Sequence, residues 1–350
     1  MSRKFVVGLK ALDEPSVVTV VASRTRANAE RFARDLGVPR ATDNYAAAVA
    51  ADDVDVVYVA TPPSEHETHA LLAIEHDKPV LVEKPFAIDA AAAARIAAAA
   101  RAAEVFCMEA MWTRFMPLVI EIKRRVDAGS LGELRAFDAS FRAAEVPDVG
   151  QSQFDANRGG GALMHRGVYG VSMARHVLGP VAGVDATARL GVTGVDEDVA
   201  AVLRHESGAL STVTASLRTS GGHGFTILGT EGRIDVRGPI YRPVSARMVA
   251  FSPRRGGLQG SGGLLRTISE FDVAQRVRQR ADGLVTMLRG PRSKRLHHPY
   301  RGNGYHYEAL EVIAASARRQ QESSVMPLNE SIEVMAVIDA ARKTWSASAR

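Results

Sequence analysis

A lysine at the end of a predicted strand is the strongest chemical signal in the sequence. The motif Val82-Glu83-Lys84-Pro85 completes a short apolar run, 79–83, which predicts a buried parallel strand. Ligands bind beyond the carboxyl ends of the strands in open α/β sheets, so we expect Lys84 to point into a functional crevice. A solvated lysine at a strand end is the alternative.

A second strand end carries residues suited to a nucleotide. The run 55–60 predicts a strand that leads into Thr61-Pro62-Pro63, followed by His66. Proline supplies no backbone donor, so the chain must leave the sheet at this point. We expect Thr61, Pro62 and His66 to lie against a nicotinamide or its ribose. The alternative is a rigid turn followed by a solvated histidine.

A third motif supplies a group for proton transfer. Three glycines, 159–161, open a predicted helix over 161–177 that carries His165 and Tyr169 on one face. The pKa of tyrosine is ordinarily about 10, and a lysine ammonium beside the phenol would lower it toward neutrality. Taken alone, Tyr169 also fits a core or interface position.

The predicted elements indicate two different sheets. In the first part, strands at 16–22, 55–60 and 79–83 alternate with helices at 27–36, 65–76 and 89–103, which is typical of a parallel, doubly wound α/β fold. Later strands alternate in polarity and predict an open, mostly antiparallel sheet covered by helices on one face. These strands are expected at 133–142, 184–192, 198–205, 209–218, 225–228 and 233–236, with helices at 117–128, 161–177, 307–318 and 329–345. We predict a Rossmann-like domain over 1–112 and a substrate and oligomerisation domain over 113–350.

The composition of the 350-residue chain excludes several classes of protein. The single cysteine, Cys107, allows no internal disulfide and no cysteine-based metal site, and its apolar neighbours predict a core residue. No apolar run reaches the length of a membrane span, and the first residues lack the apolar core of a signal peptide. We therefore expect a cytoplasmic protein with no metal site and no membrane partner.

The net charge of +5 comes from one segment. Residues 241–301 contain 13 Lys or Arg and three acidic residues, a balance of +10, which leaves about −5 for the rest of the chain. This distribution argues against nucleic acid as a partner. Within the segment, 256–298 predicts a mobile surface insertion, and a basic clamp for an acidic partner or phosphorylated ligand is the alternative. We expect deletion of 256–298 to leave the fold intact.

Together these motifs resemble the glucose–fructose oxidoreductase/inositol dehydrogenase (Gfo/Idh/MocA) family, and within it the branch of the dimeric dihydrodiol dehydrogenases. The resemblance covers nearly the whole chain outside the insertion. It is carried by VASRT at 21–25, ATPPSEH at 60–66, VLVEKP at 80–85, EAMWTRFMP at 109–117, GGGAL and GVY within 159–169, TGVDE at 193–197, GNGYHYEA at 302–309 and VMPLNES at 325–331.

The resemblance implies an NAD(P)-dependent dehydrogenase that acts on a sugar or cyclic diol. Lys84 would contact the nicotinamide ribose and the reacting hydroxyl, with Glu83 beside it in the cofactor site. Tyr169 would exchange a proton with the substrate while hydride moves to or from the nicotinamide. The resemblance also implies a homodimer or higher homo-oligomer.

The same resemblance assigns the two ends of the ligand site. Ser23 and Arg24 would lie at the adenine ribose, where an arginine and a hydroxyl suit the 2′-phosphate of NADP, with NAD as the alternative. Trp112 and Arg114 would line the substrate side, where an aromatic wall suits a sugar or diol ring.

The sequence departs from the family pattern at its start. The family begins with a strand and a G-x-G-x-x-A turn that cradles the pyrophosphate. Here the chain opens at RKFVVGLKAL, which resembles the helix that follows that turn. Losing the strand would expose sheet edges and remove phosphate-binding amides. A start codon assigned too late and a chain that lacks the element are both open, and we favour the first.

The second departure is His165, which stands where the related branch has an aspartate. A histidine is neutral or positive near neutral pH and would repel Lys84 if charged, and Arg166 adds a further positive charge. His165 could itself act as the base. The rival hypothesis is therefore a non-catalytic relative that binds a ligand or partner with impaired cofactor binding.

Overall fold

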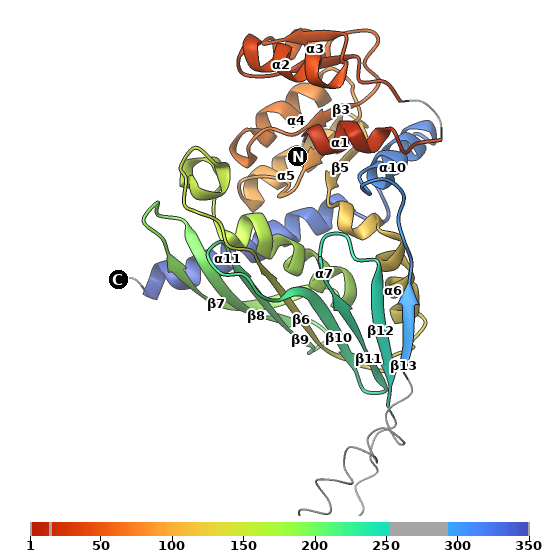
Figure 1. Cartoon of the computed structure of the whole chain (residues 1–350), viewed down its shortest axis with the longest axis vertical. Coiled ribbons are helices and arrows are strands. Elements are labelled where there is room, and N and C mark those ends of the chain that lie inside the picture. Colours follow the sequence, from red (N-terminus) through yellow and green to blue (C-terminus); the bar gives the residue numbers. More distant parts are fainter. Residues whose placement is uncertain (1, 14–15, 252–292, 349–350) are drawn as a thin grey trace, which may run out of the picture.

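The computed structural model describes residues 2–13, 16–251 and 293–348. Its N-terminal part, uppermost in Figure 1, is built from short parallel strands and helices. These elements are α1 (Ser2–Leu9), β1 (Val20–Ala22), α2 (Arg26–Leu36), β2 (Arg40–Thr42), α3 (Tyr45–Val49), β3 (Val57–Val59), η1 (Pro63–Glu65), α4 (His66–Glu75), β4 (Val80–Glu83), α5 (Ala90–Ala102) and β5 (Cys107–Ala110).

The helix boundaries follow from local capping. The side chain of Thr25 accepts a hydrogen bond from the backbone of Asn28 at the start of α2, and Gly37 ends that helix with a φ of +72°. Asp89 caps α5 in the same way by accepting from the backbone N–H of Ala92 at 2.7 Å. These starts and stops lie where the sequence predicted them.

The parallel strands of the N-terminal part form two separate sheets. β1 pairs with β2, and β3, β4 and β5 pair in that order, but β1 and β3 do not pair with each other. Among the described residues no strand lies between them. The break falls where the family pattern places its first strand, so the expected loss of continuity is confirmed.

The larger part of the molecule is an eight-stranded sheet of order β13-β12-β11-β10-β6-β9-β8-β7. Its strands are β6 (Leu134–Arg142), β7 (Val181–Leu190), β8 (Asp196–His205), β9 (Leu210–Ser216), β10 (His223–Gly229), β11 (Gly232–Arg237), β12 (Ser245–Ala250) and β13 (Ser293–His297). All pairs are antiparallel except β6 with β9. The prediction of an open, mostly antiparallel sheet is therefore confirmed.

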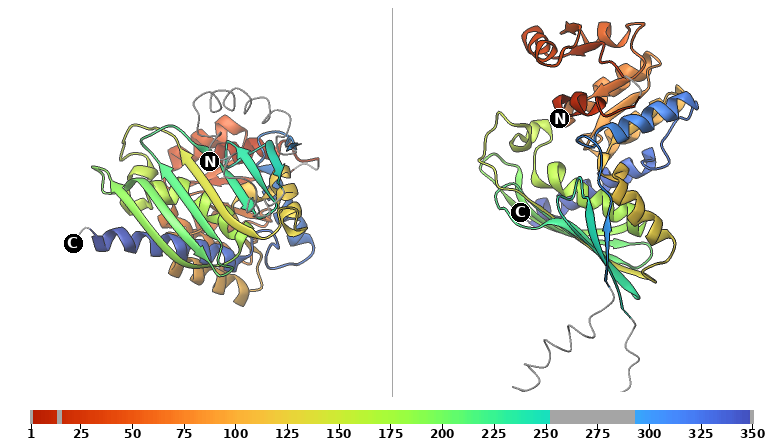
Figure 2. Two further views of the ribbon diagram at one scale, coloured as in Figure 1. Left: turned by 90° about the horizontal axis from the view of Figure 1, so that it is seen from below. Right: turned by 45° about the vertical axis from the view of Figure 1, so that its right-hand side comes forward.

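Helices cover one face of the large sheet and leave the other open (Figure 2). They are α6 (Pro117–Asp127), α7 (Val168–Leu178) and α11 (Leu328–Ser348), while α10 (His306–Ala317) lies beside α1. α11 contacts α5, α7 and β7, so the C-terminal helix connects the two parts of the molecule. The remaining short helices are η2 (Trp112–Phe115), η3 (Ser152–Phe154), η4 (Ala156–Arg158) and the π-turn η5 (Leu163–Gly167).

The predicted insertion at 256–298 is wrong at its C-terminal end. Residues 293–297 form β13, which pairs with β12 along its whole length, and the side chain of Leu296 is 2% exposed. Both strands escaped prediction because arginine and lysine interrupt their apolar alternation. Residues 256–292 of the expected insertion lie outside the described residues. Because β13 is the edge strand of the sheet, deletion of 256–298 would remove that strand, and the expectation of an intact fold is wrong for 293–297.

Few other groups in the described residues offer separate chemistry. Cys107 is fully buried in β5, as predicted for a core residue. No group of three or more His, Cys, Asp or Glu side chains that could hold a metal ion occurs in 2–13, 16–251 and 293–348. In the same residues, no helix is long and apolar enough to cross a membrane.

Truncating Leu296 tests whether β13 belongs to the folded sheet. Leu296→Ala removes a buried side chain and should lower the free energy of unfolding by about 3 kcal/mol, measured by urea denaturation. Lys294→Ala, on the same strand but exposed, should change it by less than about 0.5 kcal/mol. Equal, small effects would show that β13 contributes no buried core.

Candidate active site

Lys84 lies directly after β4, at the carboxyl end of the parallel sheet. Its Nζ donates a hydrogen bond to the backbone oxygen of His165 at 3.2 Å and lies over the ring of Tyr169, 5.0 Å from the ring centroid. Burial lowers the pKa of Lys84, while the carboxylates of Glu83 and Glu109 raise it. The side chain of Lys84 is only partly exposed and contacts His165 and Tyr169, so the alternative of a fully solvated lysine is wrong.

The partner of Lys84 lies in a π-turn, not in a regular helix. The turn, Leu163–Gly167, widens the start of the predicted helix, and α7 follows it directly. The backbone N–H of Val168 reaches the oxygen of Leu163, five residues back. Such insertions are frequent at functional sites, and this one places the His165 carbonyl opposite the lysine.

Tyr169 is 3% exposed and lies beneath the ammonium of Lys84. Its hydroxyl accepts a hydrogen bond from Nε1 of Trp112 at 3.3 Å. Burial raises the pKa of Tyr169 above its ordinary value, and the Trp112 hydrogen bond opposes this rise. The expected lowering of the pKa by Lys84 is therefore wrong for this geometry, because the ammonium faces the ring and burial dominates.

The ring of His165 is neutral at physiological pH. Burial, together with the positive charges of Lys84, Arg166 and Arg342, lowers its pKa to about 3. Its Nε2 is buried and has no hydrogen-bond partner among the described residues. A neutral imidazole does not repel Lys84, and with so low a pKa it is a weak base.

Arg166 turns away from Lys84. Arg166 is 6% exposed. Its guanidinium donates to the backbone oxygens of Ala143 and Ser216 and to the carboxylate of Glu145. It also lies over the ring of Phe141, 5.4 Å from the centroid. The added positive charge expected beside the lysine is thus largely offset by Glu145 and serves to tie down the loop that follows β6.

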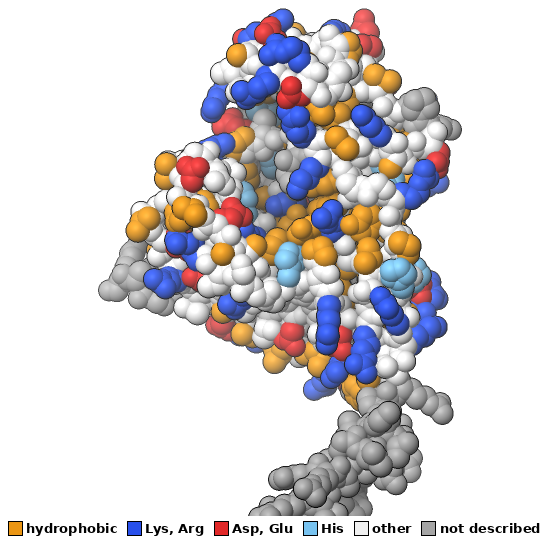
Figure 3. Space-filling model, in the orientation of Figure 1, with side chains coloured by type: hydrophobic (Ala, Val, Ile, Leu, Met, Phe, Trp, Pro, Cys, Tyr) orange, Lys and Arg blue, Asp and Glu red, His pale blue; other side chains and the backbone are white. Residues whose placement is uncertain are grey.

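Trp112 is the centre of an aromatic stack. Its ring lies 4.1 Å from that of Tyr305 at an interplanar angle of 12°, and 5.5 Å from that of Tyr241. Tyr241 in turn lies 6.0 Å from Tyr169. Trp112 and Tyr305 are buried and Tyr241 is partly exposed, so the role of Trp112 as a wall against the substrate stays a prediction. In Figure 3 a hollow separates the N-terminal part from the large sheet, and hydrophobic side chains line much of its floor.

The prediction that Arg114 contacts substrate is wrong. The side chain is fully buried, and its nitrogens donate to the hydroxyl and backbone oxygen of Ser172, to the backbone oxygen of Val325 and to the carboxylate of Glu330. A guanidinium with all these partners has no donor directed toward the hollow. Arg114 instead connects η2 to α7 and to the start of α11.

His66 connects the segments that follow β3 and β4. It is 1% exposed, with Nδ1 2.9 Å from the backbone oxygen of Pro85 and Nε2 2.8 Å from that of Thr61. Burial lowers its pKa to about 4. The solvated histidine considered from the sequence is therefore wrong, and the ring holds the Lys84–Pro85 turn instead of facing a ligand. The hydroxyl of Thr61 lies 3.1 Å from Nδ1 of His69, and Pro62 is partly exposed beside it.

Ser23 and Arg24 follow the carboxyl end of β1, which belongs to the separate two-stranded sheet. Ser23 is partly buried, and its backbone N–H donates to Thr42 of the neighbouring strand at 3.1 Å. Arg24 is exposed and forms no ion pair with any described residue. An exposed guanidinium at a strand end fits the anionic phosphate of a nucleotide.

Two buried carboxyl groups, Glu83 and Glu109, act on the charge of Lys84, and a third, Glu308, lies near Glu83. Glu83 accepts hydrogen bonds from the hydroxyl of Tyr58 at 2.5 Å and from the backbone N–H of Lys84 at 3.1 Å. Glu109 and Glu308 are both fully buried. Glu109 lies by the hydroxyl of Ser331 and the backbone of Phe86, and the oxygens of Glu308 have no hydrogen-bond partner among the described residues. Burial raises the pKa of all three, to about 7 for Glu109.

Sequence reasoning assigned no role to Glu109 and Glu308. Both were quoted only as letters of longer motifs. The available signal was a single acidic residue inside an apolar stretch, VFCMEAM for Glu109 and YHYEAL for Glu308. An acid among apolar neighbours predicts burial, and burial predicts a shifted pKa.

Comparison with known proteins places the chain in a family. Residues 3–111 match the model of an oxidoreductase family with an NAD-binding Rossmann fold, and residues 119–235 match the GFO/IDH/MocA C-terminal domain. Trans-1,2-dihydrobenzene-1,2-diol dehydrogenase of Oryctolagus cuniculus is 30% identical over 342 residues, 97% of this chain and 94% of that protein. The chain belongs to this oxidoreductase family. The enzyme of the same name from Danio rerio is 34% identical over 250 residues, 70% of this chain and 74% of that protein.

Solved structures agree with the fold of this oxidoreductase. Levoglucosan dehydrogenase in complex with NADH and levoglucosan superposes with a TM-score of 0.79 at 20% identity, covering 99% of this chain and 93% of that one. A 3-ketoreductase from Actinomadura kijaniata in complex with NADP and TDP-benzene gives 0.76 at 23% identity, covering 98% and 94%. Family membership makes the chain a nicotinamide-dependent, hydride-transferring oxidoreductase.

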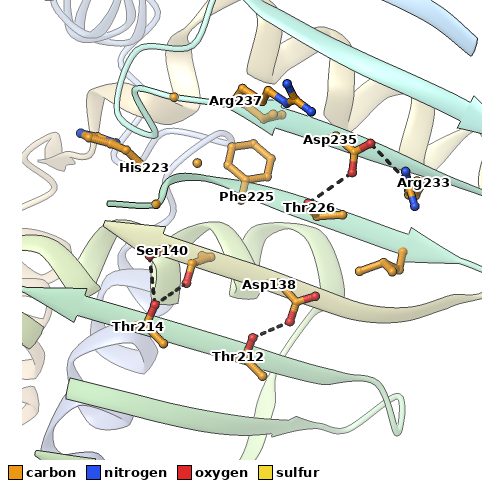
Figure 4. Close-up of a pocket in the computed structure, with 16 residues that line it drawn as sticks. Asp138, Ser140, Thr212, Thr214, His223, Phe225, Thr226, Arg233, Asp235 and Arg237 are labelled. Carbon is orange, nitrogen blue, oxygen red and sulfur yellow. Dashed lines mark hydrogen bonds and ion pairs between the residues drawn. The ribbon is translucent and has the colours of Figure 1, made fainter. Parts of the chain in front are cut away.

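A separate hollow of about 940 Å³ lies on the uncovered face of the large sheet (Figure 4). Its polar side chains already bond to one another: Thr212 to Asp138, Thr214 to Ser140, and Asp235 to both Thr226 and Arg233. It is open and contains neither Lys84 nor Tyr169. The residues that the sequence predicted for catalysis therefore lie outside this hollow.

The buried carboxyl of Glu109 should make stability depend on pH. Its pKa is raised to about 7 in the folded chain, so its stabilising contribution is complete below pH of about 4.5 and is lost as the pH rises through 7. Glu109→Gln stays neutral. Between pH 4.5 and 8, the free energy of unfolding of the unmodified chain should fall relative to that of Glu109→Gln by about 3 kcal/mol.

Denaturant unfolding at the two pH values measures this difference. Glu75→Gln, which alters an exposed carboxylate, should keep the pH dependence of the unmodified chain. If Glu109→Gln does so as well, Glu109 is ionised in the folded state and the assignment fails.

Proposed function

We propose that this oxidoreductase transfers hydride between NADP and a hydroxyl-bearing carbon of a cyclic diol or sugar, with Tyr169 as the acid/base and Lys84 as its partner. The observation that carries the proposal is the position of the Lys84 ammonium, 5.0 Å from the centre of the Tyr169 ring and partly open to the cleft. Two groups that can hold and release a proton thus meet where strand ends face the large sheet.

The chain's own residues account for proton transfer. The bound nicotinamide supplies or accepts the hydride at its C4. The Tyr169 phenolate would take the proton from the substrate hydroxyl during oxidation, and the resulting phenol would return that proton during reduction. Nε1 of Trp112 donates to the same oxygen and therefore stabilises the phenolate. Lys84 would stabilise negative charge on the substrate oxygen.

The substrate class is supported by the wall of the cleft. Trp112 and Tyr305 are only 3% and 2% exposed, so Tyr241, the partly exposed ring of the stack, is the one against which a six-membered ring can pack. The curated relatives are named for trans-1,2-dihydrobenzene-1,2-diol, and one similar structure is named for levoglucosan. A diol or sugar carried on a ring fits both names and this wall.

NADP is favoured over NAD by the residues after β1. Arg24 is exposed and unpaired among the described residues, next to the hydroxyl of Ser23, and no acidic side chain occupies either position. Both groups can donate to a 2′-phosphate. Thr61 and Pro62 at the end of β3 are proposed to lie at the nicotinamide end, beside Lys84 and Glu83.

Assembly and location are proposals of the same kind. The open face of the large sheet is available for a homodimer or higher homo-oligomer, and a small-molecule substrate is the expected ligand. Cytoplasmic location stays a prediction from the sequence.

Removing the Tyr169 hydroxyl tests the proposed acid/base. Tyr169→Phe keeps the ring over which Lys84 lies but cannot exchange a proton, so turnover of a trans-dihydrodiol or a levoglucosan-type sugar should fall at least about 100-fold. Binding of NADPH, followed by its fluorescence, should be unchanged. Full activity of Tyr169→Phe would refute the role, and Tyr307→Phe serves as the control for loss of a tyrosine hydroxyl away from the Lys84–Tyr169 pair.

Reversing the charge of Arg24 tests the cofactor preference. Arg24→Glu should raise the Kd for NADPH about 10-fold or more while leaving that for NADH unchanged or lower, because a carboxylate repels the 2′-phosphate. Arg31→Glu makes the same charge change on the exposed surface of α2 and should affect neither cofactor. Equal effects of both substitutions would remove Arg24 from the site.

A non-catalytic relative is the second candidate, favoured by the break between β1 and β3 and by His165 in place of a carboxylate. Fluorescence titration of the purified chain with NADPH distinguishes the two. Saturable binding in the micromolar range supports the enzyme, whereas no binding at millimolar NADPH supports the rival.

A further inference from the structure

The three glycines before Tyr169 form a junction between different elements. A Cβ on Gly159 would lie 2.8 Å from the side chain of Ile88 and 3.0 Å from that of Pro63, both in the N-terminal part. A Cβ on Gly161, whose φ is +119°, would lie 2.0 Å from Oδ1 of Asp196 at the start of β8. The backbone here is thus pressed against a buried carboxylate.

Asp196 is attached to the first turn of the helix that carries Tyr169. The residue is 5% exposed, and its Oδ2 accepts a hydrogen bond from the backbone N–H of Leu163 at 2.7 Å. Leu163 begins the helical run that continues through α7, where a negative charge is favourable. Arg342 of α11 donates to the oxygen of Gly160 at 3.4 Å, so β8 and α11 together hold this turn.

A single residue, Met164, separates this attachment at Leu163 from His165, whose carbonyl is the partner of Lys84. The backbone N–H of His165 donates to the oxygen of Gly161 at 3.0 Å, and the oxygen of His165 accepts from Lys84 at 3.2 Å. A change in the turn at Leu163 therefore moves the acceptor of the lysine. It also moves the start of α7, of which Tyr169 is the second residue.

We propose that Asp196 is a positioning residue for the reaction: its carboxylate fixes the π-turn and thereby the placement of Tyr169 relative to Lys84. The proposal rests on the roles proposed above for these two residues. It differs from ordinary helix capping, because a cap that only stabilises the helix would not change the geometry of the site.

A matched control is available in Asp339. Its carboxylate, on α11, accepts from the backbone N–H of Ala90 at 2.9 Å and so holds the start of α5, a helix that carries none of the site residues. Asp196→Ala and Asp339→Ala remove the same kind of contact from two different helices. Asp196→Asn keeps an oxygen acceptor and loses the charge.

Two measurements are made on each variant, in a Trp345→Phe background. The first is kcat and KM for the diol or sugar with NADPH or NADP. The second is the emission spectrum of Trp112, which becomes the single tryptophan and whose Nε1 bonds to Tyr169. The spectrum reports the position of Tyr169 without requiring turnover.

Asp196→Ala should lower kcat about 100-fold, since a shift of about 1 Å at a site can have that effect, and should shift the Trp112 emission. Asp196→Asn should lose about tenfold in kcat. Asp339→Ala should keep the kcat and emission of the parent, and the Kd for NADPH should be the same in all.

Folded Asp196→Ala with the kcat and emission of the parent overturns the proposal, as does an equal loss in Asp196→Ala and Asp339→Ala. If Asp196→Ala does not fold, unchanged kcat and emission in Asp196→Asn overturn it. A parent without turnover refutes the proposed function, and an emission shift in Asp196→Ala but not in Asp339→Ala then still supports the positioning role.

Discussion

A lysine charge held in the contact between two parts of the molecule constrains most of what surrounds it. An ammonium removed from water must be hydrogen-bonded and balanced by negative charge. Lys84 obtains its hydrogen bond from the backbone of His165 and its balance from Glu83 and Glu109. The first comes from the large-sheet part and the second from the N-terminal part, so the lysine requires both to be in place.

Several features fix the position of the His165 carbonyl that accepts from Lys84. The π-turn frees that carbonyl to face Lys84, the glycines before it allow close approach, and Asp196 holds the turn from β8. On the other side, His66 fixes the backbone of the Lys84–Pro85 turn. The position of the Lys84 side chain thus depends on contacts with the backbone made from β4, η5, β8 and α4.

Sequence reasoning could predict the meeting of Lys84 and Tyr169 but not the surroundings of either. Strand ends and helix starts follow from periodicity and caps, and the end of a parallel strand is a known location for ligands. The destination of a long side chain is not local information. Arg114 and Arg166 were read as charges near the site, yet both extend to backbone oxygens more than twenty residues away. The π-turn was equally invisible, because its sequence is that of an ordinary helix.

The break between β1 and β3 changes how the N-terminal part is held together. In place of backbone pairing between β1 and β3, side chains of α1 connect the two sides: Phe5 stacks on Tyr58 of β3 at 3.9 Å, and Arg3 forms an ion pair with Asp35 of α2. Arg24 lies on the β1–β2 side of this break. The residue proposed to select NADP is therefore carried by an element joined to Lys84 through side-chain packing.

The hydrogen bond from Lys84 to His165 also links charge to movement. A Cβ on Gly159 would meet Pro63 and Ile88, so the backbone of the glycine turn approaches the N-terminal part closely, as the hydrogen bond from Lys84 to the His165 carbonyl also requires. Parting these two elements would separate the lysine from its carbonyl. Once separated, the ammonium would regain water and its proton affinity would rise toward that of a free lysine. The proton affinity of Lys84 therefore depends on the contact between the two parts of the molecule.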